Sequence, residues 1–355
     1  MLYLGVSFAD ATLYGNIDQT YNTTKTTTAG VVTNQQTNIS AYQMGQSYLG
    51  VKGEEDLGGG MKANYLYEFG LATEKTATPT NRQSFVGLSG GFGEFRIGKQ
   101  YSKAFLNTVA ADPAGATGGA GAMYMAPVTG YANASAGLTE GPLRQDKAIQ
   151  YDLPTFVPGL NIGVTKVFGN SNSANNINDS NGDSINNGTN GVKKGDGTGF
   201  NIGYSFGGLH AGFTTDSVTG GDIYLGDTLP VVSNKTGAKN KFTTLALVYD
   251  LGVAKPSYSN VKMSVGSESV QADMFAISVP VGSSAAVFIS SSSGKVDLTG
   301  SADDLKVKGM QYGVNYSLSK RTVAYWHAGN STLTDKTTGV SAKSTGYAIG
   351  MHHSF

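Results

Sequence analysis

Residues 51–99 contain two hairpins in succession, and their pattern constrains the fold more than any other part of the chain. Each hairpin has two short runs with apolar residues at every second position, joined by a tight Gly-rich turn, EEDLGGG in the first and SGGFG in the second. A longer polar segment separates the two hairpins. Tight turns that alternate with longer polar loops are typical of the antiparallel wall of a transmembrane β-barrel.

The composition favours the same fold. Charged residues make up only 14% of the 355 residues, so part of the surface does not face water. No run approaches the roughly 18 apolar residues that a membrane-spanning helix needs. A closed barrel is then the remaining way to pair every backbone group within lipid. The fold class is therefore predicted to be all-β, a transmembrane antiparallel β-barrel.

Charge and cysteine content exclude other classes of function. The chain has 25 basic and 25 acidic residues, so no overall field would attract nucleic acid. It has no Cys, which removes disulfides and thiolate metal ligands. We expect no cofactor and no resident metal. His352 and His353 are adjacent in a strand and point to opposite faces, so they do not converge on one ion.

The alternation predicts about sixteen strands, an even number, as single-chain bacterial barrels have. Three long polar connections are expected to be exposed loops, namely residues 23–38, 169–197 and 217–240. Residues 1–9 are interpreted as a signal remnant or an added extension before a single barrel domain over residues 10–355, or alternatively as a prolongation of the first strand. The predicted strands begin near Thr12, Ser47, Met61, Ser84, Glu94, Ala148, Leu160, Gly199, Leu209, Phe242, Val253, Val270, Ala285, Lys306, Thr322 and Ser344.

Four motifs in the same order resemble the trimeric general porins of Gram-negative outer membranes, of the β-proteobacterial and neisserial type. They are LYGNIDQ (Leu13 to Gln19), KAIQYDLPTF (Lys147 to Phe156), LSKRTVAYW (Leu318 to Trp326) and GYAIGMHHSF, which ends at Phe355. The resemblance implies a homotrimer in the cell outer membrane, in contact with outer-membrane lipid and lipopolysaccharide. It also implies that Phe355 is an assembly signal read by the barrel-assembly machinery.

The connection over about residues 102–145 differs from the other loops. It contains a short possible helix, Lys103 to Ala111, and then a Gly/Ala tract that is too apolar for a surface loop. In the family that this chain resembles, the loop at this place folds into the barrel and narrows the pore. The small residues are consistent with close packing against the inner wall, although an ordinary mobile loop is the alternative.

Strand alternation assigns side chains to the pore. Leu49 faces lipid, which turns Tyr48 inward, and Ile97 faces lipid, which turns Arg96 inward. The same rule turns Arg82 outward at the rim and leaves Gln83 inward. The resemblance adds further pore-lining positions, and acids on the loop face them. The resulting pore-constriction set is Arg82, Gln83, Arg96, Lys99, Arg144, Tyr48, Asp112 and Glu140.

These features predict a passive diffusion channel for small hydrophilic solutes and ions, with weak anion selectivity. No catalytic residue is assigned. Gly87 to Gly91 matches the G-x-S-x-G pattern around Ser89, but a nucleophile elbow passes from a strand into a helix, and here the chain passes into another strand. Two alternatives stay open, an outer-membrane enzyme that uses Ser89 and a structural or adhesive barrel whose lumen is plugged.

Overall fold

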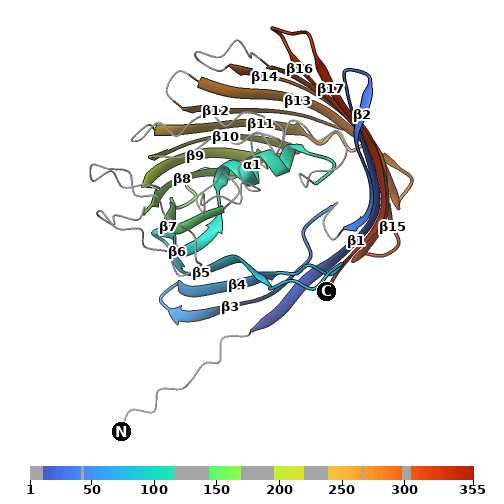
Figure 1. Ribbon diagram of the computed structural model, residues 1–355. Coiled ribbons are helices and arrows are strands. Elements are labelled where there is room, and N and C mark those ends of the chain that lie inside the picture. Colours follow the sequence, from blue (N-terminus) through green and yellow to red (C-terminus); the bar gives the residue numbers. More distant parts are fainter. Residues whose placement is uncertain are drawn as a thin grey trace.

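The computed structural model describes residues 11–40, 44–115, 144–168, 196–219, 239–265, 268–297 and 305–355. Seventeen strands form one antiparallel sheet, which closes where β1 pairs with β17. Figure 1 shows that this wall curves around α1 (Lys103–Ala111), which lies inside it. The closed wall confirms the predicted all-β barrel. The predicted remnant over residues 1–9 lies outside the described residues.

The strands follow one another around the wall, apart from one interruption. In chain order they are β1 (Thr12–Thr28), β2 (Val31–Ser40), β3 (Tyr48–Gly58), β4 (Met61–Gly70), β5 (Thr80–Gly90), β6 (Gly93–Tyr101), β7 (Arg144–Asp152), β8 (Leu160–Val167), β9 (Gly197–Phe206), β10 (Leu209–Thr219), β11 (Lys239–Tyr249), β12 (Lys255–Val265), β13 (Glu268–Val281), β14 (Ala285–Asp297), β15 (Leu305–Ser317), β16 (Thr322–Asp335) and β17 (Ser341–Ser354). β2 and β3 pair with successive parts of β1 and share one wall position, so the barrel has the expected sixteen positions.

Residues 23–38 form a hairpin, and the prediction of an exposed loop was wrong. The end of β1 pairs with β2 from Thr20 opposite Ser40 to Thr28 opposite Val31. Ala29 and Gly30 connect the strands with positive φ values of 49° and 84°, as a tight two-residue hairpin turn requires. The segment is polar but rich in β-branched Thr, which favours strands. Its polarity reflects exposure and not irregular backbone.

The two faces of the wall differ as a barrel in lipid requires. On the outer face, Val86 is 62% exposed and Ile97 is 47% exposed, although both are apolar. On the inner face of the same two strands, Gln83 and Gln100 are 8% and 1% exposed. Apolar side chains outside and polar side chains inside are the arrangement of an outer-membrane barrel. The two other predicted loops lie mostly outside the described residues, and their described ends extend β9, β10 and β11.

No helix among the described residues is long and apolar enough to cross a bilayer.

Candidate pore constriction

The inward loop leaves the wall after β6 and at once forms α1. The Ser102 hydroxyl caps the helix by accepting a hydrogen bond of 3.0 Å from the Phe105 N–H. The Phe105 ring stacks on Tyr101 with ring centroids 5.0 Å apart. The predicted helix therefore has the predicted bounds, and its first turn is attached to the last residue of β6.

Contacts with the opposite wall hold α1 inside the barrel. The Asn107 side-chain amide donates to the Gly212 carbonyl at 2.8 Å and to the Thr244 hydroxyl at 3.0 Å. Near the end of the helix, the Ser257 hydroxyl donates to the Ala111 carbonyl at 2.6 Å. Gly212 is required for this approach, because a Cβ there would lie 1.9 Å from the Asn107 amide oxygen. The described part of the loop thus crosses the lumen as predicted.

An apolar patch on the inner wall receives the helix. Ala104 and Ala111 of α1 are fully or almost fully buried, and they pack with inward residues of β11 to β13 such as Val261, Met263 and Met274. Burial of apolar area stabilises such a contact by about 25 cal/mol per Å². This patch holds the helix on the side of the lumen opposite to most of the predicted pore residues.

Arg82 points into the lumen, so the prediction that it faces outward was wrong. β5 contains a bulge at this position, because Glu68 pairs with Gln83 and the next residue of β4, Phe69, pairs with Asn81. The extra residue in a bulge interrupts strict alternation and re-aims a side chain. Arg82 and Gln83 are consequently both buried on the inner face, with exposures of 5% and 8%.

The Glu68 carboxylate neutralises Arg82, and the sequence analysis did not predict it. Glu68 of β4 lies 3.5 Å from the Arg82 Nε and is itself only 4% exposed. Glu68 also accepts hydrogen bonds from the Tyr14 hydroxyl at 2.7 Å and from the Gln83 amide at 3.0 Å. Alternation could have found it, since Tyr67 and Phe69 face outward and leave Glu68 inward.

Tyrosine rings alternate with arginine side chains along this part of the wall. The Arg82 guanidinium lies 4.6 Å from the Tyr48 ring centroid and 5.9 Å from that of Tyr101. Arg144 lies 4.9 Å from the same Tyr101 ring, and it donates to the Tyr101 hydroxyl at 3.3 Å. Planar guanidinium groups stack well on aromatic faces, which holds long side chains in fixed positions. We call Tyr48, Arg82, Tyr101 and Arg144 the arginine–tyrosine row.

A second charged group lies near the start of α1. Asp152 accepts from the Arg96 guanidinium at 2.9 Å and from the Lys103 ammonium at 2.6 Å, and Glu94 lies 3.8 Å from Arg96. Burial lowers the pKa of Lys103, and the neighbouring Asp152 acts in the opposite direction. Arg96 points inward, as the strand alternation predicts. Asp152 and Lys103 were not among the predicted pore residues.

Lys99 lies on the outer face of the wall, in contrast to its predicted place in the pore. It pairs with Ser84 in the strand ladder, next to the outward pair Val86 and Ile97. Its ammonium forms an ion pair of 3.0 Å with Asp146. Residues directly opposite in antiparallel strands share one face, so alternation excludes Lys99 from the lumen.

Of the two acidic residues predicted on the loop, Asp112 and Glu140, only Asp112 lies within the described residues. Asp112 is buried directly after α1, where its carboxylate accepts a hydrogen bond of 2.9 Å from the Ala114 N–H. It therefore shapes the turn after the helix. Glu140 lies outside the described residues.

A second segment, residues 44–47 before β3, also lies against the inner wall, and no sequence pattern predicted it. β2 ends with Ser40 opposite Thr20, β3 begins with Tyr48 opposite Asn16, and residues 44–47 precede β3. Asp18 is fully buried, and its carboxylate accepts from the Met44 N–H at 3.4 Å. The Ser47 hydroxyl donates to the Asp18 carbonyl at 3.2 Å. In this segment, the Gln46 side-chain oxygen accepts a hydrogen bond from the guanidinium of Arg82, a member of the arginine–tyrosine row.

A closed barrel with an inward helix beside a row of charged side chains defines a membrane-spanning barrel of the porin class. A family model described as Gram-negative porin matches residues 4–336. The chain belongs to this family and is a protein of the outer membrane.

Two full-length comparisons agree with this assignment. The chain is 27% identical to Outer membrane porin protein 32 of Delftia acidovorans over 385 aligned residues, which cover 98% of this chain and 94% of that protein. The structure titled anion-selective porin from Comamonas acidovorans has a TM-score of 0.76 at 23% identity, and the match covers 98% of this chain and all of the other.

Similarity to neisserial proteins is higher but more local. Major outer membrane protein P.IB of Neisseria gonorrhoeae is 45% identical over 96 residues, which cover 26% of this chain and 27% of that protein. The corresponding Neisseria meningitidis protein is 38% identical over 109 residues. The chain spans 31% of the length of that relative.

Proposed function

We propose that the protein is a passive diffusion channel for small hydrophilic solutes and ions, formed by a single barrel domain over residues 10–355. The observation that carries this proposal is the position of α1, which is docked inside the closed barrel with its first turn against Tyr101 of the arginine–tyrosine row and its later turns against β10 to β12. A loop held inside a barrel narrows the passage, and charged side chains at a constriction set the ion preference.

The described charges support a weak preference for anions. Glu68 offsets Arg82, and the carboxylates of Asp152 and Glu94 offset Arg96 and Lys103. Within the described ranges, Arg144 forms no ion pair, so the row carries a small positive excess. Tyr48 and Gln83 add no charge. The solved structure with the similar fold is titled anion-selective, in agreement with this sign.

Conductance in a planar bilayer tests the proposal. Purified protein should form discrete channels in KCl, and a salt gradient should give a reversal potential shifted modestly toward that of chloride. A barrel that inserts but passes no current would instead be the plugged structural barrel.

The enzyme alternative depends on Ser89. This residue lies within β5, where it pairs with Lys62 and Glu94, and the chain turns at Gly91 directly into β6. A serine nucleophile needs an exposed strand-to-helix turn and an adjacent base. The ladder position of Ser89 therefore favours the channel.

The oligomeric state and the partners are also proposed, on the basis of the family resemblance. We expect a homotrimer in contact with outer-membrane lipid and lipopolysaccharide, and recognition of Phe355 by the barrel-assembly machinery. Phe355 closes the seam of the barrel by exchanging backbone hydrogen bonds of 3.0 and 3.2 Å with Gly15. Its ring lies over Gly15, where a Cβ would come within 2.9 Å of the ring, and the residue is 41% exposed. An exposed terminal aromatic at the seam is accessible to a partner before closure.

A further inference from the structure

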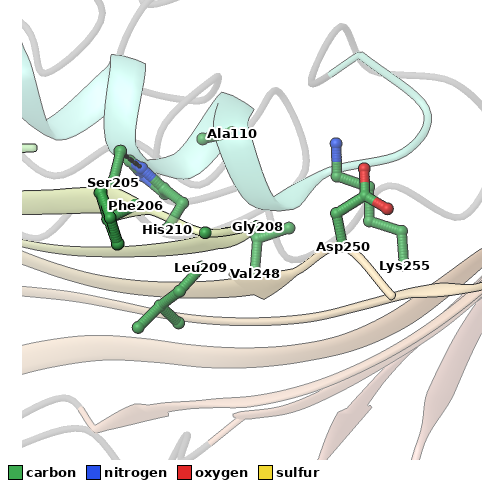
Figure 2. Close-up of a pocket in the computed structure, with 10 residues that line it drawn as sticks. Ala110, Ser205, Phe206, Gly208, Leu209, His210, Val248, Asp250 and Lys255 are labelled. Atoms are coloured by element: carbon green, nitrogen blue, oxygen red, sulfur yellow. Dashed lines mark hydrogen bonds between the residues drawn. The ribbon is translucent and has the colours of Figure 1, made fainter. Parts of the chain in front are cut away.

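A cavity of about 550 Å³ lies between the end of α1 and the short-turn ends of β9 to β12. Figure 2 shows Ala110 on the helix, with His210 and Ser205 toward the left of the view and Asp250 and Lys255 toward the right. The polar lining comes from two hairpins, one turning at Gly207 and Gly208 and the other following β11. The cavity is separate from the arginine–tyrosine row, which lies on β3, β5, β6 and β7.

Two hydrogen-bond donors of the cavity, His210 and Lys255, have donor capacity that the described residues around them do not use. The His210 Nδ1 forms a hydrogen bond of 2.8 Å with the Ser205 hydroxyl, and its Nε2 has no partner among the described residues. Lys255 forms no ion pair with any described residue, although Asp250 lines the same cavity. Buried polar groups are usually hydrogen-bonded, so an unpartnered imidazole nitrogen beside an open cavity indicates a missing partner.

Among the described residues that line the cavity, Asp250 carries the single carboxylate, and it already has a structural role. Asp250 accepts a hydrogen bond of 2.8 Å from the Gly252 N–H, which holds the turn between β11 and β12. The last carbonyl of α1 is likewise occupied, because the Ser257 hydroxyl donates to it. Asp250 and the Ala111 carbonyl already accept hydrogen bonds, so the donors His210 and Lys255 outnumber the free acceptors among the described residues. An ammonium and an imidazole N–H together suit a carboxylate or a phosphate group, since hydrogen bonds to a charged oxygen are the strong ones.

We propose that this cavity is a binding site for small organic oxyanions, with Lys255 and His210 as the recognition residues. When Ser205 donates to Nδ1, the imidazole proton lies on Nε2, which then donates to the ligand. A volume of about 550 Å³ is within the range of small-molecule sites and exceeds the need of a single oxyanion group. Val248 and Leu209 line the cavity and would contact an apolar part of the ligand. This proposal rests on the proposed channel function, because a ligand bound in this cavity would lie beside the path along which solutes cross the barrel.

Partial block of the channel tests this site. Inorganic phosphate and acetate are titrated separately into a bilayer at constant KCl, and block of the open-channel current is measured. Both probes should block the native channel, and block by one probe alone would identify its group as the ligand chemistry. Lys255→Gln and His210→Gln should each raise the half-blocking concentration by roughly tenfold, the size expected for loss of a charge-assisted hydrogen bond.

Matched variants make the outcome decisive. Lys320→Gln removes a lysine from another short turn and should leave block unchanged, and Lys255→Arg should restore block in part. Asp250→Asn should strengthen block by an anion, whereas weaker block would show that the site takes a cationic or zwitterionic group and would overturn the assignment. Equal block in Lys255→Gln and in native channels would also overturn it. A protein that conducts no KCl would instead refute the channel function itself.

Discussion

Replacing Arg144 by Glu should abolish or reverse the anion preference of the channel. Arg144 begins β7, where the inward loop returns to the wall, and its guanidinium lies against Tyr101. It forms no ion pair with any described residue, so its replacement leaves no buried carboxylate without a partner. The Tyr101 hydroxyl, now bonded to Arg144 at 3.3 Å, can donate to the new carboxylate. Folding should therefore be preserved, since lumen positions tolerate changes of charge.

The expected size follows from Coulomb's law. A unit charge about 5 Å from a permeating ion contributes about 0.8 kcal/mol at the dielectric constant of water. The substitution changes the charge by two units, and screening over a Debye length of about 10 Å in 0.1 M salt leaves about 1 kcal/mol. The change disfavours the anion and favours the cation equally, so the anion-to-cation permeability ratio should fall by about 2 kcal/mol, up to roughly thirtyfold. In 1 M salt, where the Debye length is about 3 Å, the change should shrink to about threefold.

Reversal potentials in a KCl gradient measure this ratio at each salt concentration. Arg144→Gln and Lys99→Gln form a matched pair, because each removes one positive charge, the first beside the lumen and the second on the outer face. Only Arg144→Gln should shift the reversal potential. A potential unchanged in Arg144→Glu would show that this side chain does not line the pore, and it would refute the placement of the 102–145 loop inside the barrel.

Two further substitutions and one deletion test other parts of the barrel. Glu68→Gln keeps a hydrogen-bond acceptor but releases the positive charge of its arginine partner, so reversal potentials in 0.1 M KCl should show anion preference higher by roughly threefold, and a lower preference would contradict the charge assignment. Gly212→Ala should displace Asn107 and increase single-channel conductance, whereas Gly203→Ala, where a Cβ finds its nearest neighbour at 3.9 Å, should not. Deletion of Phe355 should lower the amount of folded, heat-modifiable protein in the outer membrane without reducing synthesis, and an unchanged yield would leave it without a role in assembly.

The sequence alone determined the class of fold and most strand positions. Alternating apolar residues, low charge and the lack of a long apolar run together leave a closed barrel, because lipid supplies no hydrogen bonds to the backbone. Alternation also placed Tyr48, Gln83 and Arg96 on the inner face. These conclusions depend on local periodicity, which each strand carries in its own residues. Helix α1 could also be predicted, because a short helix depends mainly on its own residues.

The arrangement of the charged residues at the constriction depends on contacts between strands. The bulge that turns Arg82 inward arises from pairing between β4 and β5, and its position depends on both strands. The partners Glu68 and Asp152 are brought to their cations by neighbouring strands and by the start of α1. Residues 44–47 reach Asp18 because β2 and β3 pair with successive parts of β1. Register and bulges are properties of strand pairs, so a pattern read along one strand does not contain them.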